Sequence, residues 1–329
     1  MAQAFSFSFT ESFMAAHAGV LLKSTHFDVD AILRVYEAIK PVAADLGVEA
    51  PRPRLAGFGY PHVVSLGAPV EFPDDGEPNV GPVLRSPRDI DRLREPADYL
   101  AAPLLRQRLQ LATELGRRRA DALSQFIGHL YEGPITTAVL LYGQDFFTLV
   151  YDDPARAHAL LRFCTETALS YADALHRHFH GDTPIAPGPR GNPDDFAGML
   201  PPALFEEFVI PYWHRLYDGQ QATRRHLHSE LLREAHLPFL VSAKIDSFDP
   251  SADQYVTPEL LSRKCHCPFR TLVKDWEIHD LSADALAAYY REIAGYRPFV
   301  IAFSLSAREE LGKIRRLLQV ARELQGSGT

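Results

Sequence analysis

From residue 124 onward, short apolar runs alternate with amphipathic segments of helical spacing, and no other feature constrains the fold as strongly. The expected strand regions, each followed by a predicted helix, are FIGHLYEGPITTAVLLYG, TPIAPG, RRHLH, PFLVSAKIDSF, RTLVKDWEI and PFVIAFSLS. The predicted helices cover 152–180, 202–219, 229–236, 257–264, 280–295 and 307–324. Parallel strands need a crossover connection, which is usually a helix. The alternation therefore predicts an α/β fold with a parallel sheet.

The first part of the chain has a different pattern. Helical spacing covers 28–48, and 87–120 is helical again, with Ser86 and Pro87 at its start. The Pro- and Gly-rich stretch between them predicts an irregular excursion with small strands. No GxGxxG or GxxxxGK[ST] motif follows an early strand, which disfavours a doubly wound sheet. We predict a (β/α)8 (TIM) barrel with N-terminal helices, a single domain over 1–325, and a disordered tail over 326–329.

Composition excludes several classes of protein. The net charge is -8 and the sequence pI is about 6.0, so no electrostatic feature favours nucleic acid. No apolar run reaches the roughly 18 residues of a membrane span, and the first residues lack the basic and then apolar pattern expected of a secretory leader. These features predict a cytoplasmic protein without a membrane contact. Three cysteines, Cys164, Cys265 and Cys267, cannot form a disulfide framework in a chain of 329 residues and are expected to be reduced.

In a (β/α)8 barrel, the side chains that face the active-site mouth come from the carboxyl ends of strands. This rule selects the polar residues that end the predicted strands or follow them. They are Asp194, Asp195, His228, Ser229, Glu230, Lys244, Asp246, Asp249, Lys274, Asp275, Ser304 and Ser306. We expect Asp194, Asp195, Lys244 and Ser304 to bind substrate, and His228, Glu230 and Asp246 to supply acid–base chemistry.

The segment HLHSE is the most specific of these candidates. Alternate residues of a strand share a face, so His226, His228 and Glu230 can converge on zinc or another divalent cation. A structural interpretation stays open beside it. Ser229 can cap the following helix and Glu230 can complement the helix dipole, which leaves the histidines as ordinary strand residues.

Other polar clusters have structural explanations. Asp194 and Asp195 can orient a substrate or share a proton, and they are also suitable residues for a helix entry. Cys265-His266-Cys267 offers soft ligands, but no second CxxC or HxxxH completes a zinc site. Because these cysteines follow a predicted helix, we place them at the stabilising end of the barrel, as structural or incidental thiols.

Several stretches resemble the uroporphyrinogen decarboxylase superfamily. They are GAPVEFPDDGEPNV, SPRDIDRLREP, GPITTAVLLYGQDFFTLVYDDPARAHALL and DDFAGMLPPALFEEFVIPY, in this order, and the resemblance covers most of 55–320. It is strongest to the branch that includes methylcobalamin:coenzyme M methyltransferases. The resemblance implies a (β/α)8 barrel that is often dimeric, a small-molecule substrate, and a methyl-carrying corrinoid protein as a partner.

The functional residues of both branches are altered. The methyltransferases hold zinc with a His-x-Cys pair and a later Cys. Here the matching positions read His226-Leu227-His228, or His228-Ser229-Glu230 when shifted, and the last strand offers only Ser304 or Ser306. The decarboxylases bind their acidic porphyrinogen with an Arg-rich N-terminal motif. In this chain the segment 10–25 is TESFMAAHAGVLLKST and contains no arginine.

Three hypotheses follow. The first is a one-carbon (methyl) transferase, in which a bound metal would polarise the acceptor. The second is a decarboxylase of a small organic acid, with His228 or Asp246 delivering a proton to the carbanion. The third is a non-catalytic barrel that binds a small molecule, which a mouth plugged by apolar side chains would indicate.

Overall fold

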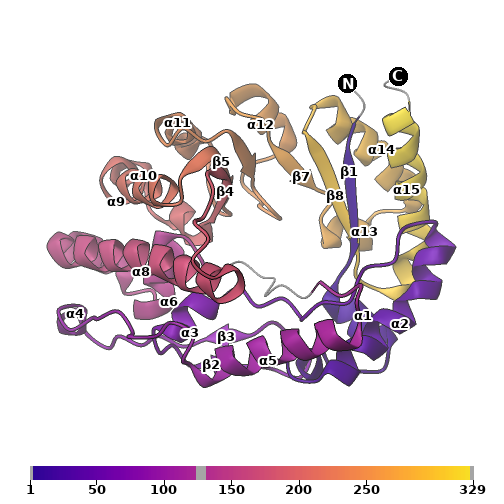
Figure 1. The fold of residues 1–329 in the computed structure, drawn as a ribbon. Helices are drawn as coiled ribbons and strands as arrows, with labels where there is room; N and C mark the ends of the chain where they lie inside the picture. Colours follow the sequence, from indigo (N-terminus) through magenta and orange to yellow (C-terminus); the bar gives the residue numbers. More distant parts are fainter. Residues whose placement is uncertain (1–2, 124–130, 327–329) are drawn as a thin grey trace.

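The computed structural model describes residues 3–123 and 131–326 and has an α/β fold with two parallel three-stranded sheets (Figure 1). One sheet has the order β4-β5-β6 and the other β1-β8-β7. An isolated parallel bridge between Phe248 and Phe269 joins them, so six parallel strands follow one another along an arc. These strands are β1 (Phe5–Phe9), β4 (Gly188–Pro193), β5 (Ala222–His228), β6 (Ser247–Asp249), β7 (Arg270–Leu272) and β8 (Val300–Leu305).

Helices cover the outer side of this arc, and the N-terminal part of the chain lies across one end of it (Figure 1). The longer helices are α2 (Val29–Leu46), α5 (Pro103–Arg118), α8 (Pro154–His180), α10 (Ile210–Gly219), α14 (Ala283–Gly295) and α15 (Leu311–Gly326). The shorter ones are α1 (Glu11–His17), α3 (Pro61–Ser65), α4 (Pro87–Ile90), α6 (Pro134–Tyr142), α7 (Phe146–Asp152), α9 (Phe205–Phe208), α11 (Leu237–Ser242), α12 (Pro258–Lys264) and α13 (Asp275–Asp280). The predicted small strands are β2 (Val70–Glu71) and β3 (Asn79–Val80), an antiparallel pair.

The first strand, β1, was not assigned from the sequence, although its residues FSFSF alternate strictly. Phe7 pairs with Phe303 of β8, and Ser8 pairs with Ser304. Because side chains alternate across a strand, the phenylalanines pack toward the helices while the serines face the inner side. Phe9 and Phe303 belong to a core with residues of α2, α14 and α15. The N-terminal strand is thereby held beside the last one.

Two apolar runs that were predicted as strands are helices. Pro134–Tyr142 forms α6, in which only Leu140 is not fully buried, and PFLVS lies within α11. Short apolar runs do not reveal their period, so buried helix and buried strand cannot be distinguished by pattern alone. In both cases a proline near the helix start, Pro134 and Pro238, was the available signal. The part of the first run over 126–130 lies outside the described residues.

The region after β5 also differs from its prediction. The expected helix over 229–236 is an irregular segment that ends in a 3-10 turn, Glu234–His236. The strand after it is only Ser247–Asp249, so Lys244 and Asp246 precede β6 instead of ending it. At the other end of the chain, α15 continues to Gly326, one residue into the predicted tail; 327–329 lie outside the described residues.

The core has two main parts. One lies between β5, β6 and helices α6 to α12, and the other between β1, β8 and helices α1, α2, α14 and α15. In the described part of the chain, no helix is both long and apolar enough to cross a membrane. Whether 1–325 is one domain stays a prediction.

Candidate active site

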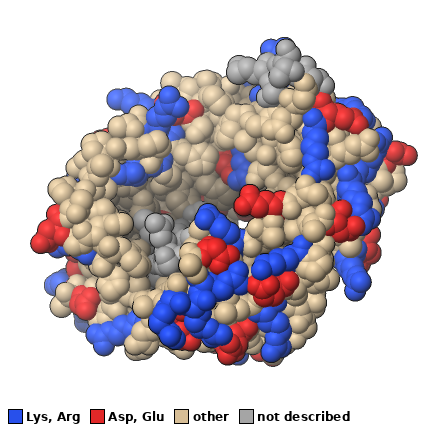
Figure 2. Space-filling view, turned by 45° about the vertical axis from the view of Figure 1, so that its right-hand side comes forward, with Lys and Arg blue, Asp and Glu red and all other residues tan. Residues whose placement is uncertain are grey.

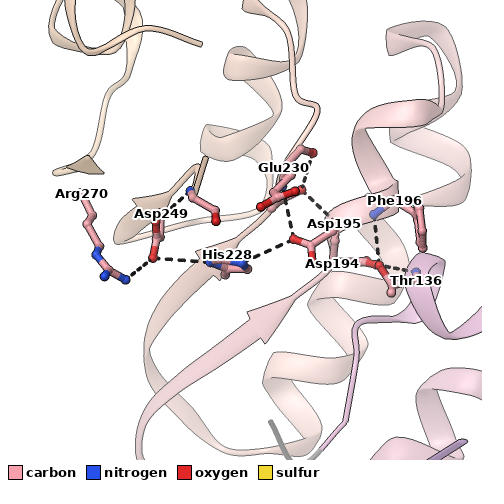
Figure 3. A network of polar contacts seen from close by, with 10 residues as sticks. Thr136, Asp194, Asp195, Phe196, His228, Glu230, Asp249 and Arg270 are labelled. Carbon is pink, nitrogen blue, oxygen red and sulfur yellow. Dashed lines mark hydrogen bonds and ion pairs between the residues drawn. The ribbon is translucent and has the colours of Figure 1, made fainter. Parts of the chain in front are cut away.

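Four neighbouring strands each place one charged side chain in the same network (Figure 3). Asp195 follows β4, His228 ends β5, Asp249 ends β6 and Arg270 begins β7. The Nε2 atom of His228 lies 3.6 Å from Oδ1 of Asp195, and its Nδ1 lies 3.4 Å from Oδ2 of Asp249. Arg270 donates to the same Oδ2 over 2.7 Å. The imidazole is therefore held between two carboxylates at the carboxyl ends of parallel strands.

The register of the parallel sheet explains this convergence. His228 pairs with Pro193 on one side and with Asp249 on the other. Leu227, one residue earlier, is fully buried in the core under the helices, so His226 and His228 face the opposite, inner side. In parallel sheets with helices on one side, this strand end is where ligands and catalytic groups gather.

The electrostatics of His228 favour its charged form. Burial opposes the charge, but the contact with Asp249 and the negative charges of Asp195 and Glu230 outweigh it. The pKa of His228 is therefore raised above its ordinary value of 6.5. A raised pKa makes the neutral imidazole a stronger base and keeps more imidazolium available near neutral pH.

Asp249 is the most strongly ionised member of the network. Burial alone would raise its pKa, but hydrogen bonding to His228 and the charges of Arg270 and His228 hold the pKa well below its usual range. Its other oxygen accepts from the backbone N–H of Ser251 over 2.9 Å. With both oxygens bonded, the carboxylate has a fixed orientation toward the imidazole.

Asp194 and Asp195 are neighbours in sequence but face different surroundings. Asp194 is fully buried and accepts hydrogen bonds from the N–H groups of Ile135 and Thr136 and from Nε1 of Trp213. It therefore caps α6 and anchors α10, on the helix side of the sheet. Burial raises the pKa of Asp194 to about 6 against these donors. Of the predicted carboxylate pair, the structure brings only Asp195 to His228.

Gly133 shows how tightly this cap is packed. A Cβ atom at this position would lie 2.4 Å from the Cβ and Cγ atoms of Asp194, which is far closer than real contacts allow. Glycine therefore permits the close approach of the 131–133 segment to the end of β4.

Glu132 is a buried acid that sequence reasoning missed. Only 8% of its surface is exposed, and Oε2 has no hydrogen-bond partner among the described residues. Tyr131 and Gly133, on either side, contact Gln220 and Asp194. Glu132 itself lies close enough to Asp195 and Asp194 for their charges to act on it. Burial, followed by the charges of Asp195 and Asp194, raises its pKa well above 4.5, which favours the protonated form. An acid directly before Gly-Pro and an apolar helix was the available signal.

The predicted metal ligands are not gathered around one point. His226 Nδ1 contacts Oγ of Ser247 over 2.9 Å, and both nitrogens of His228 face carboxylates. Over residues 3–123 and 131–326, no three His, Cys, Asp or Glu side chains are arranged as ligands. Glu230 contributes its backbone N–H to Asp195 over 3.3 Å. In this arrangement the side chains do not fit a zinc ion, so the metal predicted at His226, His228 and Glu230 would require them to rearrange.

The placements predicted for Lys244 and Asp246 are wrong, because the strand that they were expected to end begins after them. Asp246 is exposed and accepts from the backbone N–H of Arg225 over 2.8 Å, at the amino end of β6. Lys244 is exposed in the turn between α11 and β6. Ser304 lies near the carboxyl end of β8 and contacts Ser8 over 3.0 Å, in the other three-stranded sheet from His228.

Figure 2 shows a hollow in the surface of the molecule. Most of its visible wall is formed by residues other than Lys, Arg, Asp and Glu. A separate cavity of about 1310 Å³ lies elsewhere, between α8, the end of α5 and the segments that precede β4 and β5. None of Asp195, His228, Asp249 and Arg270 lines it. We place the candidate site at the network because charged groups converge there from four strands.

The family model for uroporphyrinogen decarboxylase (URO-D) matches residues 62–259 of the chain. The chain belongs to this family. The matched residues include Glu132, Asp195, His228 and Asp249, but not Arg270. The resemblance noted from the sequence is thereby confirmed.

Among solved structures, a methyltransferase from Methanosarcina mazei is similar, with a TM-score of 0.68 and 15% sequence identity. The similarity covers 98% of this chain and 94% of that protein. At this identity the likeness shows a shared fold. A search of curated proteins by sequence finds no match.

We expect substitution of each of the two neighbouring aspartates to show which one stabilises the fold and which one belongs to the candidate site. Asp194→Ala leaves three buried donors without an acceptor, so the free energy of unfolding falls by about 3 kcal/mol or more. Asp195→Ala, which removes one bond to the Glu230 N–H, costs about 1 kcal/mol. Urea denaturation measures both, and equal losses would contradict the assigned roles.

The pKa of His228 tests the Asp249 contact directly. Asp249→Asn removes a charge beside Nδ1 and lowers the pKa by about one pH unit or more, whereas Asp246→Asn at the other strand end leaves it unchanged. Imidazole NMR titration measures both. The raised pKa stabilises the fold fully below pH 6.5, and this contribution is lost as pH rises through the folded-state pKa. Equal pKa values in the wild type and Asp249→Asn would refute the contact.

Proposed function

We propose that the chain is a one-carbon (methyl) transferase that acts on a small molecule, with His228 as its acid–base group. The observation that carries this proposal is the imidazole held by Asp249 on Nδ1, with Nε2 facing Asp195. A histidine oriented by a carboxylate on one nitrogen is suited to proton transfer on the other.

In this proposal Asp249 fixes the tautomer of His228, and Arg270 keeps Asp249 ionised. Nε2 of His228 then removes the proton of the acceptor's O–H, N–H or S–H group as the methyl group arrives. Asp195, whose Oδ1 lies 3.6 Å from Nε2, stabilises the imidazolium that this proton transfer forms. Deprotonation increases the nucleophilicity of the acceptor, which is what methyl transfer needs.

Glu132 supplies the second polar feature of the proposed site. In its protonated form, which the raised pKa favours, it can donate a hydrogen bond to a substrate oxygen, which an ionised carboxylate cannot do. We propose that it orients the substrate relative to His228. Its buried position makes the donor sensitive to the shape of the ligand.

The fold and the family resemblance support the rest of the proposal. We propose that the six-stranded arc belongs to a (β/α)8 barrel whose two remaining strands lie between β1 and β4. The methyl donor is proposed to be a corrinoid protein, as the resemblance to the methyltransferase-like branch implies.

A decarboxylase of a small acid is the second candidate, and the raised pKa of His228 is the observation that favours it. The imidazolium would donate its Nε2 proton to the carbanion that remains when carbon dioxide leaves. Both candidates use the same residue in opposite protonation states.

We predict that His228→Ala lowers kcat/KM by about 10²- to 10⁴-fold, because it removes the acid–base group. Asp249 keeps its ion pair with Arg270 in this variant. His178→Ala, on an exposed part of α8, is the matched control. Methyl transfer to candidate acceptors and carbon dioxide release from candidate acids are measured in parallel. Full activity of His228→Ala in both assays would exclude the proposal, and binding without turnover by the wild type would favour a non-catalytic barrel.

Metal content gives an independent test of the donor set. Protein purified without chelators is expected to hold well under one equivalent of zinc, because no three ligands converge among the described residues. Elemental analysis of wild type and His226→Ala measures this. One equivalent in the wild type that is lost in the variant would show that His226, His228 and Glu230 rearrange around a metal.

A further inference from the structure

Two of the three cysteines face each other before β7, the strand that begins with Arg270. Cys265 and Cys267 lie in the loop that joins α12 to β7, with their Sγ atoms 3.6 Å apart. We propose that this pair is a reversible redox-modification site, which forms an intrachain disulfide by exchange with a small-molecule disulfide such as oxidised glutathione.

The geometry gives the two thiols different roles. Cys265 is half-buried, and exposed His266 and Lys264 flank it, whereas Cys267 is buried. An attacking thiol must meet the small disulfide from solvent, so Cys265 is the first nucleophile. Hydrogen bonding from the Cys267 thiol lowers the pKa of Cys265, which favours its reactive thiolate.

The exchange balances in two steps. The Cys265 thiolate attacks one sulfur of the small disulfide, forms a mixed disulfide and expels one thiolate, which takes up a proton. Cys267 then loses its proton and attacks Sγ of Cys265, which expels the second small thiol. Two cysteine thiols are oxidised and one small disulfide is reduced to two thiols. The sulfurs must move from 3.6 Å to the bonding distance of about 2 Å, which a local movement of the loop can provide.

The loop leads directly into the junction between the two three-stranded sheets. Pro268 accepts a hydrogen bond from the N–H of Phe248, and Phe269 forms the single bridge to β6. The next residue, Arg270, holds Asp249. Formation of the disulfide requires the loop to move three residues before Arg270, a member of the candidate site. Oxidation is therefore expected to weaken the pairing at this junction.

The proposal is tested on the full-length chain in glutathione buffers of graded redox potential, followed by alkylation and peptide mass mapping. The wild type is expected to lose two hydrogens from the peptide that contains Cys265 and Cys267. Cys164, fully buried in α8, stays reduced and is the internal control. Cys267→Ser should stop at a glutathione adduct on Cys265, Cys265→Ser should react little, and Cys164→Ser should behave as the wild type.

Hydrogen exchange supplies a readout that requires no substrate. The oxidised chain is expected to exchange faster than the reduced chain over 266–272, while β1 exchanges equally in both. The proposal is overturned if both thiols stay reduced where a reference dithiol is oxidised, or if the wild type accumulates the same adduct as Cys267→Ser. Because no activity is measured, these outcomes do not depend on the proposed function.

Discussion

The contact between His228 and Asp249 is the interaction on which the chemical account depends. Two neighbouring parallel strands end at the same level, so the imidazole of one meets the carboxylate of the next without a long loop. Arg270 supplies a third charge from β7, beyond the bridge that joins the two sheets. The positions of Asp249 and Arg270 relative to each other therefore depend on the bridge between Phe248 and Phe269. A change in strand register there would separate the charges.

Strand alternation then decides which polar residues belong to the site and which belong to the scaffold. Asp194 and Asp195 differ by one position, yet Asp194 caps α6 and bonds Trp213, while Asp195 faces His228. The first role needs an acceptor in a buried helix layer, and the second needs a charge at the inner side. A pair of acids that looks like one functional unit thus divides into a structural residue and a candidate catalytic residue.

Much of this arrangement could be predicted from the sequence, and the errors have a common cause. The run RRHLH predicted both a strand and the position of His228, because the run ends at His228, directly before Ser229 and Glu230. PFLVSAKIDSF contains a helix and a short strand, and its apolar residues do not reveal where one ends. The boundary error moved the expected acid from Asp249 to Asp246, to the opposite end of β6. Glu132 was missed because its role depends on burial and on neighbours distant in sequence.

Two places in the molecule compete as the binding site: the His228 network and the cavity of about 1310 Å³ beside α8. A crystal structure of the protein with bound substrate or product shows most directly which of the two is the binding site. The account predicts ligand atoms within hydrogen-bond distance of Nε2 of His228 and of Glu132. A ligand held in the cavity beside α8, with Nε2 of His228 facing Asp195 as before, would contradict it.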